Sequence, residues 1–301
     1  TFRCKGFYPS SIHFSIFFEQ KPYLLTVYRY FCAVHWSGKV FDGYIKYNFH
    51  VSIAVWALAQ ITALDFGFPL HYTDQMIFFM APFLGYNFIK FHLYFFKKEF
   101  PKSNFSILLF IFLLCSLFLF TASFYLPFSS QILLFLTLIL VLLYCLPLPG
   151  FELNFRGFKG LKIHLVALSW VLISVFLPLS TESEHLSNTT MVYGFQRYLF
   201  VLVATLPFEI RDLKLDDPKL STWPQKWGIK NTQIFGGVLL LLFVFIEVYF
   251  SPSNHVASAI FIALLLMILV IKANEDQTKY FSSFWVEGIP ILWLILRIIF
   301  L

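Results

Sequence analysis

Three acidic residues follow one another at a spacing that could hold a metal ion: Glu209, Asp212 and Asp216. If the helix of the preceding apolar run continues to Asp216, these positions lie on one of its faces. Stacked carboxylates repel one another, so such a face needs either good solvation or a bridging divalent cation. Mg²⁺ favours sites in which one or two carboxylates share the ion with substrate phosphates. The alternative interpretation is a solvated, charged helix end at the level of the lipid headgroups.

Basic residues accompany this acidic cluster. They are Arg211, Lys214, Lys219, Lys226 and Lys230. Arginine and lysine bind phosphate oxygens through charge-assisted hydrogen bonds. Unless the stretch is only a solvated helix end, it indicates a site for Mg²⁺ and phosphate groups.

The composition places this stretch in a membrane protein. Of the 301 residues, 59% are hydrophobic and 13% are charged, whereas soluble domains carry about 25% charged residues. Mean hydropathy is +0.76. This composition argues against a soluble globule, a disordered chain, a coiled coil and a disulfide scaffold. It also argues against a nucleic-acid-binding domain, so the lipid bilayer is expected as a partner and nucleic acid is not.

One long uncharged run points to helices. Residues 103–151 contain no Lys, Arg, Asp or Glu, and Pro127 stands near the middle of the run. One bilayer crossing needs about 20 apolar residues, so this run predicts a helical hairpin. A β-barrel would instead show alternation with a period of two residues.

Apolar runs separated by polar, proline or glycine residues predict about nine membrane-spanning helices. We therefore expect an all-α fold, a polytopic helical bundle in the membrane. The expected spans cover roughly residues 47–64, 75–96, 104–124, 129–147, 162–179, 190–208, 232–250, 255–272 and 283–301.

Among the loops between these spans, only alternate ones contain lysine or arginine. The loops around Asp65, Tyr125, Glu182 and Ser251 contain none. Basic residues are retained on the cytoplasmic side of a membrane, so the N-terminal side and the acidic cluster are expected to be cytoplasmic, in a bacterial plasma membrane. The other four loops hold Lys97, Lys98 and Lys102; Arg156, Lys159 and Lys162; Arg211, Lys214, Lys219, Lys226 and Lys230; and Lys272 and Lys279.

The N-terminal residues differ from the remainder of the chain. Residues 1–42 are expected to be a poorly ordered extension or a fragment, and residues 43–301 one transmembrane domain. The four cysteines, Cys4, Cys32, Cys115 and Cys145, lack the spacing of a zinc or redox site.

The acidic cluster and the residues after it resemble the second aspartate motif of the UbiA superfamily of intramembrane prenyltransferases. In that family a D-x-x-x-D motif follows the sixth of nine transmembrane helices. The resemblance extends over roughly residues 43–301, and Tyr144 and Pro147 close the fourth span as in many members. The matching stretch reads Glu209-Ile-Arg-Asp212-x-x-x-Asp216, followed by Ser221-Thr222-x-Pro224-Gln225-Lys226-x-Gly228.

The resemblance implies a reaction. Family members hold Mg²⁺ on the diphosphate of a polyprenyl donor, and a lipophilic acceptor, often an aromatic ring, captures the allylic cation. Asp212 and Asp216 are the implied metal ligands and, with Asn87, the implied catalytic residues. The expected diphosphate-binding residues are Lys90, Arg211, Lys214, Lys226 and Tyr144.

The first aspartate motif of the family, N-D-x-x-D-x-x-x-D on the second helix, is altered in this chain. Asn87 is kept, but Phe88, Phe91 and Phe95 stand at the three aspartate positions. Phenylalanine cannot bind a metal, so one Mg²⁺ site is expected, at the second motif.

Lys90 lies inside the same span, where an ionisable group needs a partner or a water-filled cavity. Its ammonium group could contact a diphosphate directly. It could instead reach the inner headgroups or pair with Glu287, which lies at a similar depth in the ninth span.

Other charged or ionisable residues in the spans suggest structural roles. Arg197 and Glu247 are expected to form an ion pair, and His92 and His164 to be hydrogen-bonded packing residues. Two other functions stay open. The chain could be a non-catalytic protein that binds a polyprenyl or quinone-type lipid. A transporter is less favoured, because its charges should lie near the bilayer midplane.

The loop charges predict which residues face outward. Single cysteines at Ser183 and Ser253, in a cysteine-free background, should react with a membrane-impermeant thiol reagent in intact cells. Cysteines at Ser103 or Thr222 should not react in intact cells. Labelling at Thr222 from outside would overturn the orientation and, with it, the cytoplasmic position of the acidic cluster.

Overall fold

The computed structural model describes residues 38–97, 105–146, 160–182, 187–252 and 255–299. The chain divides into two compact units, Thr1–Tyr47 and Asn48–Leu301. In the first unit residues 38–46 form a helix. The prediction that residues 1–42 are poorly ordered falls mostly outside the described residues.

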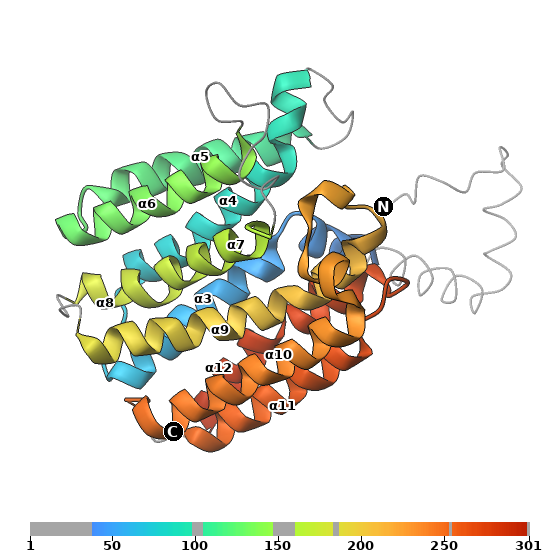
Figure 1. The fold of residues 1–301 in the computed structure, drawn as a ribbon. Coiled ribbons are helices and arrows are strands. Elements are labelled where there is room, and N and C mark those ends of the chain that lie inside the picture. The colour runs from blue at the N-terminus through green and yellow to red at the C-terminus, as the bar shows by residue number, and fades with distance from the viewer. Residues whose placement is uncertain (1–37, 98–104, 147–159, 183–186, 253–254, 300–301) are drawn as a thin grey trace, which may run out of the picture. The chain divides into compact units, whose positions relative to one another are not determined.

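The described part of the second unit consists of helices joined by short loops, with no strand (Figure 1). This arrangement confirms the expected all-α fold. The helices are α3 (Phe49–Phe66), α4 (Tyr72–Lys97), α5 (Phe105–Ser123), α6 (Phe128–Cys145), α7 (Lys162–Val171), α8 (Leu177–Thr181), α9 (Asn188–Arg211), α10 (Trp223–Phe250), α11 (Val256–Lys272) and α12 (Ile289–Ile299). The π-helical segments η2 (Leu172–Phe176) and η5 (Phe281–Val286) precede α8 and α12, and the 3-10 turns η3 (Asp212–Lys214) and η4 (Pro218–Leu220) lie between α9 and α10.

Each of the nine expected spans falls on a helix, or on consecutive helical segments, of the described residues. Six of these helical stretches are long and apolar enough to cross a membrane, and α5 and α11 contain shorter apolar stretches. The positions of the helices therefore agree with those predicted from the sequence. The number of helices that cross the membrane stays a prediction.

Short polar residues and glycine set several helix boundaries. At the start of α9, the backbone N–H of Ser187 donates to Thr190 Oγ1 at 2.9 Å and that of Thr190 donates to Ser187 Oγ at 3.2 Å. This reciprocal pair satisfies two amides that the helix leaves open. At the end of α3, Gly67 adopts a φ of 75°, a left-handed conformation that glycine reaches without steric cost.

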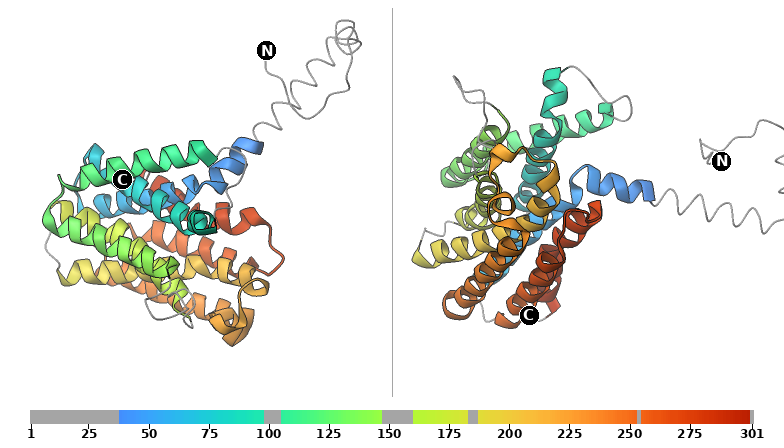
Figure 2. Two further views of the ribbon diagram at one scale, coloured as in Figure 1. Left: turned by 90° about the horizontal axis from the view of Figure 1, so that it is seen from above. Right: turned by 45° about the vertical axis from the view of Figure 1, so that its right-hand side comes forward.

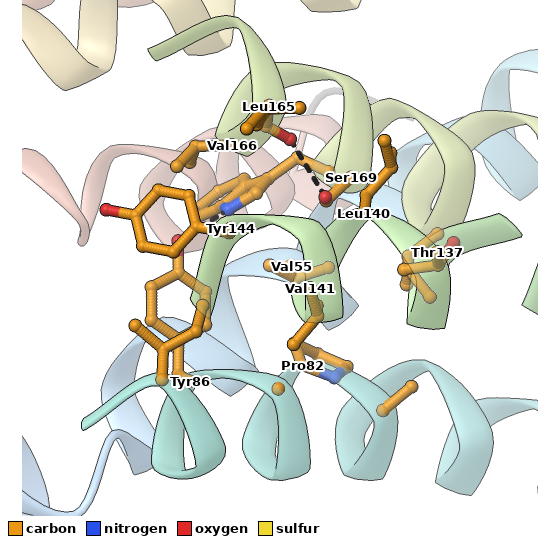
Figure 3. Close-up of a pocket in the computed structure, with 15 residues that line it drawn as sticks. Val55, Pro82, Tyr86, Thr137, Leu140, Val141, Tyr144, Leu165, Val166 and Ser169 are labelled. Carbon is orange, nitrogen blue, oxygen red and sulfur yellow. Dashed lines mark hydrogen bonds between the residues drawn. The ribbon is translucent and has the colours of Figure 1, made fainter. Parts of the chain in front are cut away.

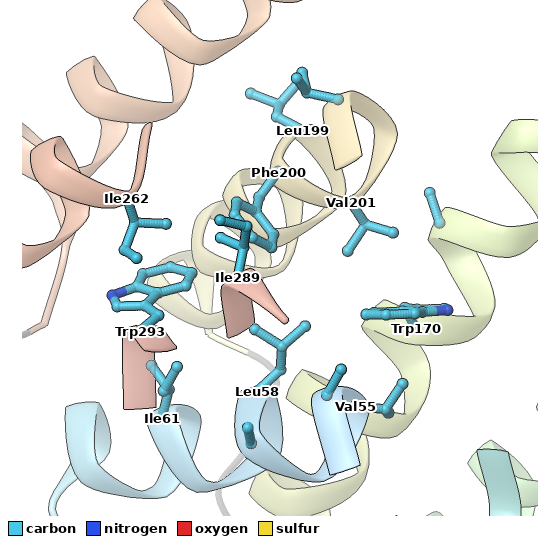
Figure 4. Close-up of a cluster of buried hydrophobic side chains, with 14 of the residues drawn as sticks. Val55, Leu58, Ile61, Trp170, Leu199, Phe200, Val201, Ile262, Ile289 and Trp293 are labelled. Atoms are coloured by element: carbon cyan, nitrogen blue, oxygen red, sulfur yellow. The ribbon is translucent and has the colours of Figure 1, made fainter. Parts of the chain in front are cut away.

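The core of the second unit is built mainly from α3, α7, α9, α10, α11 and α12. Figure 4 shows Ile289 and Trp293 of α12 between side chains of α3 and α9. The Trp293 ring lies 5.3 Å from the Phe200 ring and 5.7 Å from the Phe243 ring, centroid to centroid. Lipid is as apolar as these side chains, so close packing is what favours helix association here.

Helices α5 and α6 lie at the edge of this core, with only a few side chains packed against it. Figures 1 and 2 show them on the other side of α3 and α9 from α11. Helix α5 packs against α4, and α6 packs against α4, α7 and α8. Most apolar side chains of α5 and α6 are at least partly exposed, as expected for helices that face lipid.

A buried ion network links α3, α10 and α12. Arg297 Nη2 lies 2.9 Å from Glu247 Oε1 and 3.5 Å from Asp65 Oδ2, and all three side chains are 1% exposed. Two residues of α9 complete the network: Gln196 donates to Glu247 at 2.6 Å, and the Tyr193 hydroxyl donates to Asp65 at 2.8 Å. Four helices are therefore fixed by one arginine.

The expected pair of Arg197 and Glu247 is wrong, because the cation on Glu247 is Arg297. Arg197 instead donates to the Tyr193 hydroxyl at 2.6 Å, and its guanidinium carbon lies 4.8 Å from the centroid of the Trp293 ring. Sequence spacing placed both residues on neighbouring helices, but it could not show that a third helix supplies the arginine.

Arg297→Met should destabilise the protein strongly, because Asp65 and Glu247 would lose their shared cation. Breaking a buried pair by removing one partner costs about 3 to 5 kcal/mol. The measurement is thermal unfolding in detergent. Adding Asp65→Asn and Glu247→Gln to Arg297→Met should restore much of the lost stability, and Lys272→Met, on an exposed side chain, should leave it unchanged. Equal stability of Arg297→Met and wild type would contradict this account.

Candidate functional site

The acidic cluster lies where α9 ends. The helix stops at Arg211, and Asp212 begins the 3-10 turn η3. The expectation that the helix continues to Asp216 is therefore wrong, and Glu209, Asp212 and Asp216 do not share one helix face. Pro218 begins the next turn, η4, and a proline disfavours helix at the residue before it.

Lys162, the first residue of α7, joins two of these carboxylates. Its Nζ lies 2.9 Å from Glu209 Oε1 and 2.8 Å from Asp216 Oδ2. The exposed fractions of the three side chains are 12%, 4% and 9% for Lys162, Glu209 and Asp216. Two carboxylates from separate elements thus converge on one buried cation. The sequence indicated Lys162 only as a basic residue at the start of the fifth span.

Asp212 is held by its neighbour. Arg211 Nε lies 2.7 Å from Asp212 Oδ1, and Arg211 Nη2 donates to Asp212 Oδ2 at 3.3 Å. Arg211 also donates to Ser283 Oγ at 3.5 Å and lies over the Phe208 ring. The guanidinium therefore links the end of α9 to η5.

The two other predicted phosphate ligands on this side lie farther out. Lys214 is exposed and forms ion pairs with Glu275 at 3.2 Å and Asp276 at 2.9 Å. It therefore ties η3 to the loop after α11. Lys226 is exposed on the first turns of α10, and no contact joins it to Lys162 or Arg211 among the described residues. The structure brings Lys162 and Arg211, rather than Lys214 and Lys226, to the acidic residues.

The altered first motif lies on α4. Asn87 is 2% exposed; its amide donates to the Phe83 carbonyl at 2.8 Å and its oxygen accepts from Asn48 at 3.1 Å. Phe88 packs against the cluster of Tyr144, Cys145 and Leu165. Phe91 is buried, and the Phe95 side chain lies outside the described ones. Asn87 thus fixes α4 to the residue before α3, while phenylalanine rings fill positions where the family places ligands.

Lys90 is exposed, and its charge interacts with Glu287 of the ninth predicted span. The charges of Lys90 and Arg211 both act on Glu287, which lies between η5 and α12. This arrangement fits the interpretation that Lys90 and Glu287 interact.

An apolar cavity of about 100 Å³ lies between α4, α6 and α7 (Figure 3). Tyr86 and Tyr144 stand at one end of it, and Trp170 Nε1 donates to the Tyr86 hydroxyl at 2.7 Å. Leu165 and Val166 also line the cavity, and they follow Lys162 by about one turn of α7. The aromatic end of the cavity therefore points to the charged cluster.

A larger groove adjoins this cavity. It has a volume of about 740 Å³, lies between α4, α5 and α6, and is lined mainly by phenylalanine and leucine. Ligand sites commonly have volumes of about 300 to 1,000 Å³. Because five residues line both spaces, the two are neighbours: Ala81, Gly85, Thr137, Val141 and Ile173.

The chemistry of the second motif fits the Mg²⁺ that the resemblance implies. Glu209 and Asp216 direct oxygens at one shared cation, and Mg²⁺ commonly uses one or two carboxylates together with substrate phosphates. No group of three or more His, Cys, Asp or Glu side chains suited to a metal occurs among the described residues. Glu209 joins Asp216 as a candidate ligand, while the ligand role of Asp212 stays a prediction.

Comparison with known proteins identifies the fold. Neither a family model nor a curated protein matches the sequence. A solved structure, that of a UbiA homologue from Archaeoglobus fulgidus, matches with a TM-score of 0.57 over 86% of this chain and 98% of that chain, at 9% sequence identity. The chain has the UbiA fold. This confirms the fold that the second aspartate motif indicated.

Some residues of the candidate site could not be predicted from the sequence, because only the fold brings them there. Tyr86, Trp170 and Asn48 reach the site only because α4, α7 and the start of α3 meet there. The two histidines make hydrogen bonds as expected: His92 Nδ1 lies 2.8 Å from the Ile89 carbonyl, and His164 Nδ1 lies 2.5 Å from the Tyr198 hydroxyl.

Lys90→Met should weaken binding of a polyprenyl diphosphate about ten- to a hundredfold, because a charge-assisted contact contributes about 1.5 to 3 kcal/mol. Binding of a prenyl alcohol with the same tail, measured in the same detergent, should not change. If Lys90 only partners Glu287, the variant should instead lose thermal stability, recover it with Glu287→Gln, and bind the diphosphate normally. That second pattern would contradict a phosphate role.

Proposed function

We propose that this protein binds a polyprenyl diphosphate and transfers the prenyl group to a lipophilic acceptor within the membrane. One observation carries the proposal. On a UbiA fold, an apolar cavity beside a larger apolar groove ends in tyrosines, and its lining residues Leu165 and Val166 follow the buried cation Lys162 on α7. A prenyl chain matches the apolar part, and a diphosphate matches this lysine.

The charged end suits the leaving group. Arg211, Lys162 and Lys90 each offer N–H donors at the inner ends of different helices, and diphosphate oxygens accept such hydrogen bonds strongly. When the bond between the allylic carbon and oxygen breaks, its electron pair stays on the diphosphate. Stabilising that developing negative charge lowers the barrier. Mg²⁺, when held by Asp216 with Glu209 or Asp212, would supply further charge neutralisation.

The aromatic end suits the cation. Tyr86, Tyr144 and Trp170 surround the end of the cavity, and the faces of aromatic rings stabilise positive charge. Apolar walls also keep water from capturing the cation. The acceptor would enter through the groove between α4, α5 and α6, attack the allylic carbon, and release a proton.

A second candidate function is binding of a polyprenyl or quinone-type lipid without catalysis. It is favoured by Phe88 and Phe91, which stand at carboxylate positions of the first motif: Phe88 packs beside Tyr144, and Phe91 is buried. A protein that lacks one metal site can keep the apolar cavity as a binding site.

Release of diphosphate separates the two functions. Purified protein in lipid vesicles with Mg²⁺, labelled prenyl diphosphates of increasing length and a lipophilic extract as acceptor source should release diphosphate and form a labelled apolar product. Asp216→Asn should reduce the rate at least about tenfold, the scale of one lost transition-state contact. Asp217→Asn, an exposed neighbour, is the matched control and should not. Tight binding without release would support the second candidate, and absence of both would contradict the proposal.

A further inference from the structure

We propose that Lys162 makes the binding of Mg²⁺ and the binding of the diphosphate donor depend on each other. Without ligands, its ammonium group occupies the cation position between Glu209 and Asp216. When both ligands bind, the ammonium moves from the carboxylates to the diphosphate. The donor part of this inference rests on the proposed function, whereas the competition between Lys162 and metal does not.

The first step is the geometry of the three side chains. Both carboxylate contacts of Lys162 are shorter than 3 Å, and about nine-tenths of each side chain is buried. The ammonium lies at the point where the two carboxylates converge. A divalent ion that uses both carboxylates must take that point, so Lys162 and Mg²⁺ compete for it.

The second step concerns what the displaced ammonium would meet. A metal ion alone would leave the positive charge of Lys162 largely buried beside a divalent cation, which is costly. Other carboxylates at this end interact with other cations: Asp212 is paired with Arg211, Glu275 and Asp276 are paired with Lys214, and the charges of Arg211 and Lys90 act on Glu287. Lys162 therefore needs an anion that the ligand brings.

The third step is how far the Lys162 ammonium can move. Lysine carries its charge on a flexible four-carbon stem. Lys162 precedes the cavity-lining residues Leu165 and Val166 on α7, and its charge also acts on Tyr144 at the cavity end. A change of side-chain rotamer can therefore turn the ammonium from the carboxylates toward a head group at that end, without movement of α7.

The consequence is positive coupling. The donor supplies the partner that frees the carboxylates, and the metal releases the ammonium for the donor. Coupling of this kind is reciprocal, so each ligand must raise the affinity of the other by the same factor.

Lys162→Gln tests the competition directly. Titration of the variant with Mn²⁺, followed by electron paramagnetic resonance as a probe for Mg²⁺, should show metal binding at least about tenfold tighter than in wild type without donor. The same variant should bind farnesyl diphosphate more weakly than wild type. Opposite changes for the two ligands are the signature, since a purely structural lysine would weaken both or neither. Lys272→Gln, an exposed lysine at the end of α11, is the control and should change neither.

If Lys162→Gln fails to fold, titration of the wild-type protein with Mn²⁺ tests the inference. Its affinity for Mn²⁺ should rise at least about tenfold with saturating farnesyl diphosphate, after subtraction of metal bound by the diphosphate in solution. Equal Mn²⁺ affinity with and without donor, or unchanged Mn²⁺ affinity in a folded Lys162→Gln variant, would overturn the inference. Failure of wild type to bind any donor would contradict the proposed function, and the donor-free titration of Lys162→Gln would still test the competition.

Discussion

Every charge that this bundle buries needs a partner, because hydrocarbon offers none. Helix α9 shows the constraint at both ends. In the half that begins at Asn188, Gln196 and Tyr193 bond to carboxylates that share Arg297. At its other end, Glu209 shares Lys162 with Asp216. The first cluster fixes four helices by pairing protein groups with one another, and the second places a flexible lysine beside a cavity.

This difference separates a structural cluster from a candidate site. Arg297 is held by carboxylates on two other helices and is 1% exposed, so a ligand could replace none of its contacts without loss of stability. Lys162 is held by carboxylates that a metal ion can also bind, and the aromatic end of an apolar cavity follows it on α7. Exchange of partners is possible at the second cluster, and exchange is what binding of a charged ligand requires.

The sequence predicted the helices well because apolar run length and loop charge act locally. It also predicted the fold, since the spacing of Asp212 and Asp216 after the sixth span is a local pattern. It could not predict partners across the bundle. Arg297 rather than Arg197 pairs with Glu247, and Lys162 rather than a continuous helix face brings Glu209 and Asp216 together. Such pairs depend on helix rotation and on where α9 ends, which neighbouring helices determine.

The two sides of the candidate site therefore differ in chemistry. On α4, Phe88 packs beside Tyr144 where the family pattern has a carboxylate. On α9 and η3 the carboxylates remain, each beside a basic residue. Under the proposed function, a site with metal ligands on one side only must neutralise the diphosphate with protein cations on the other. Lys90, one turn after Tyr86 on α4, stands on the side that has phenylalanine in place of these carboxylates. The proposal therefore assigns this positive charge to the donor diphosphate, because phenylalanine alone would leave that side without any group that binds phosphate.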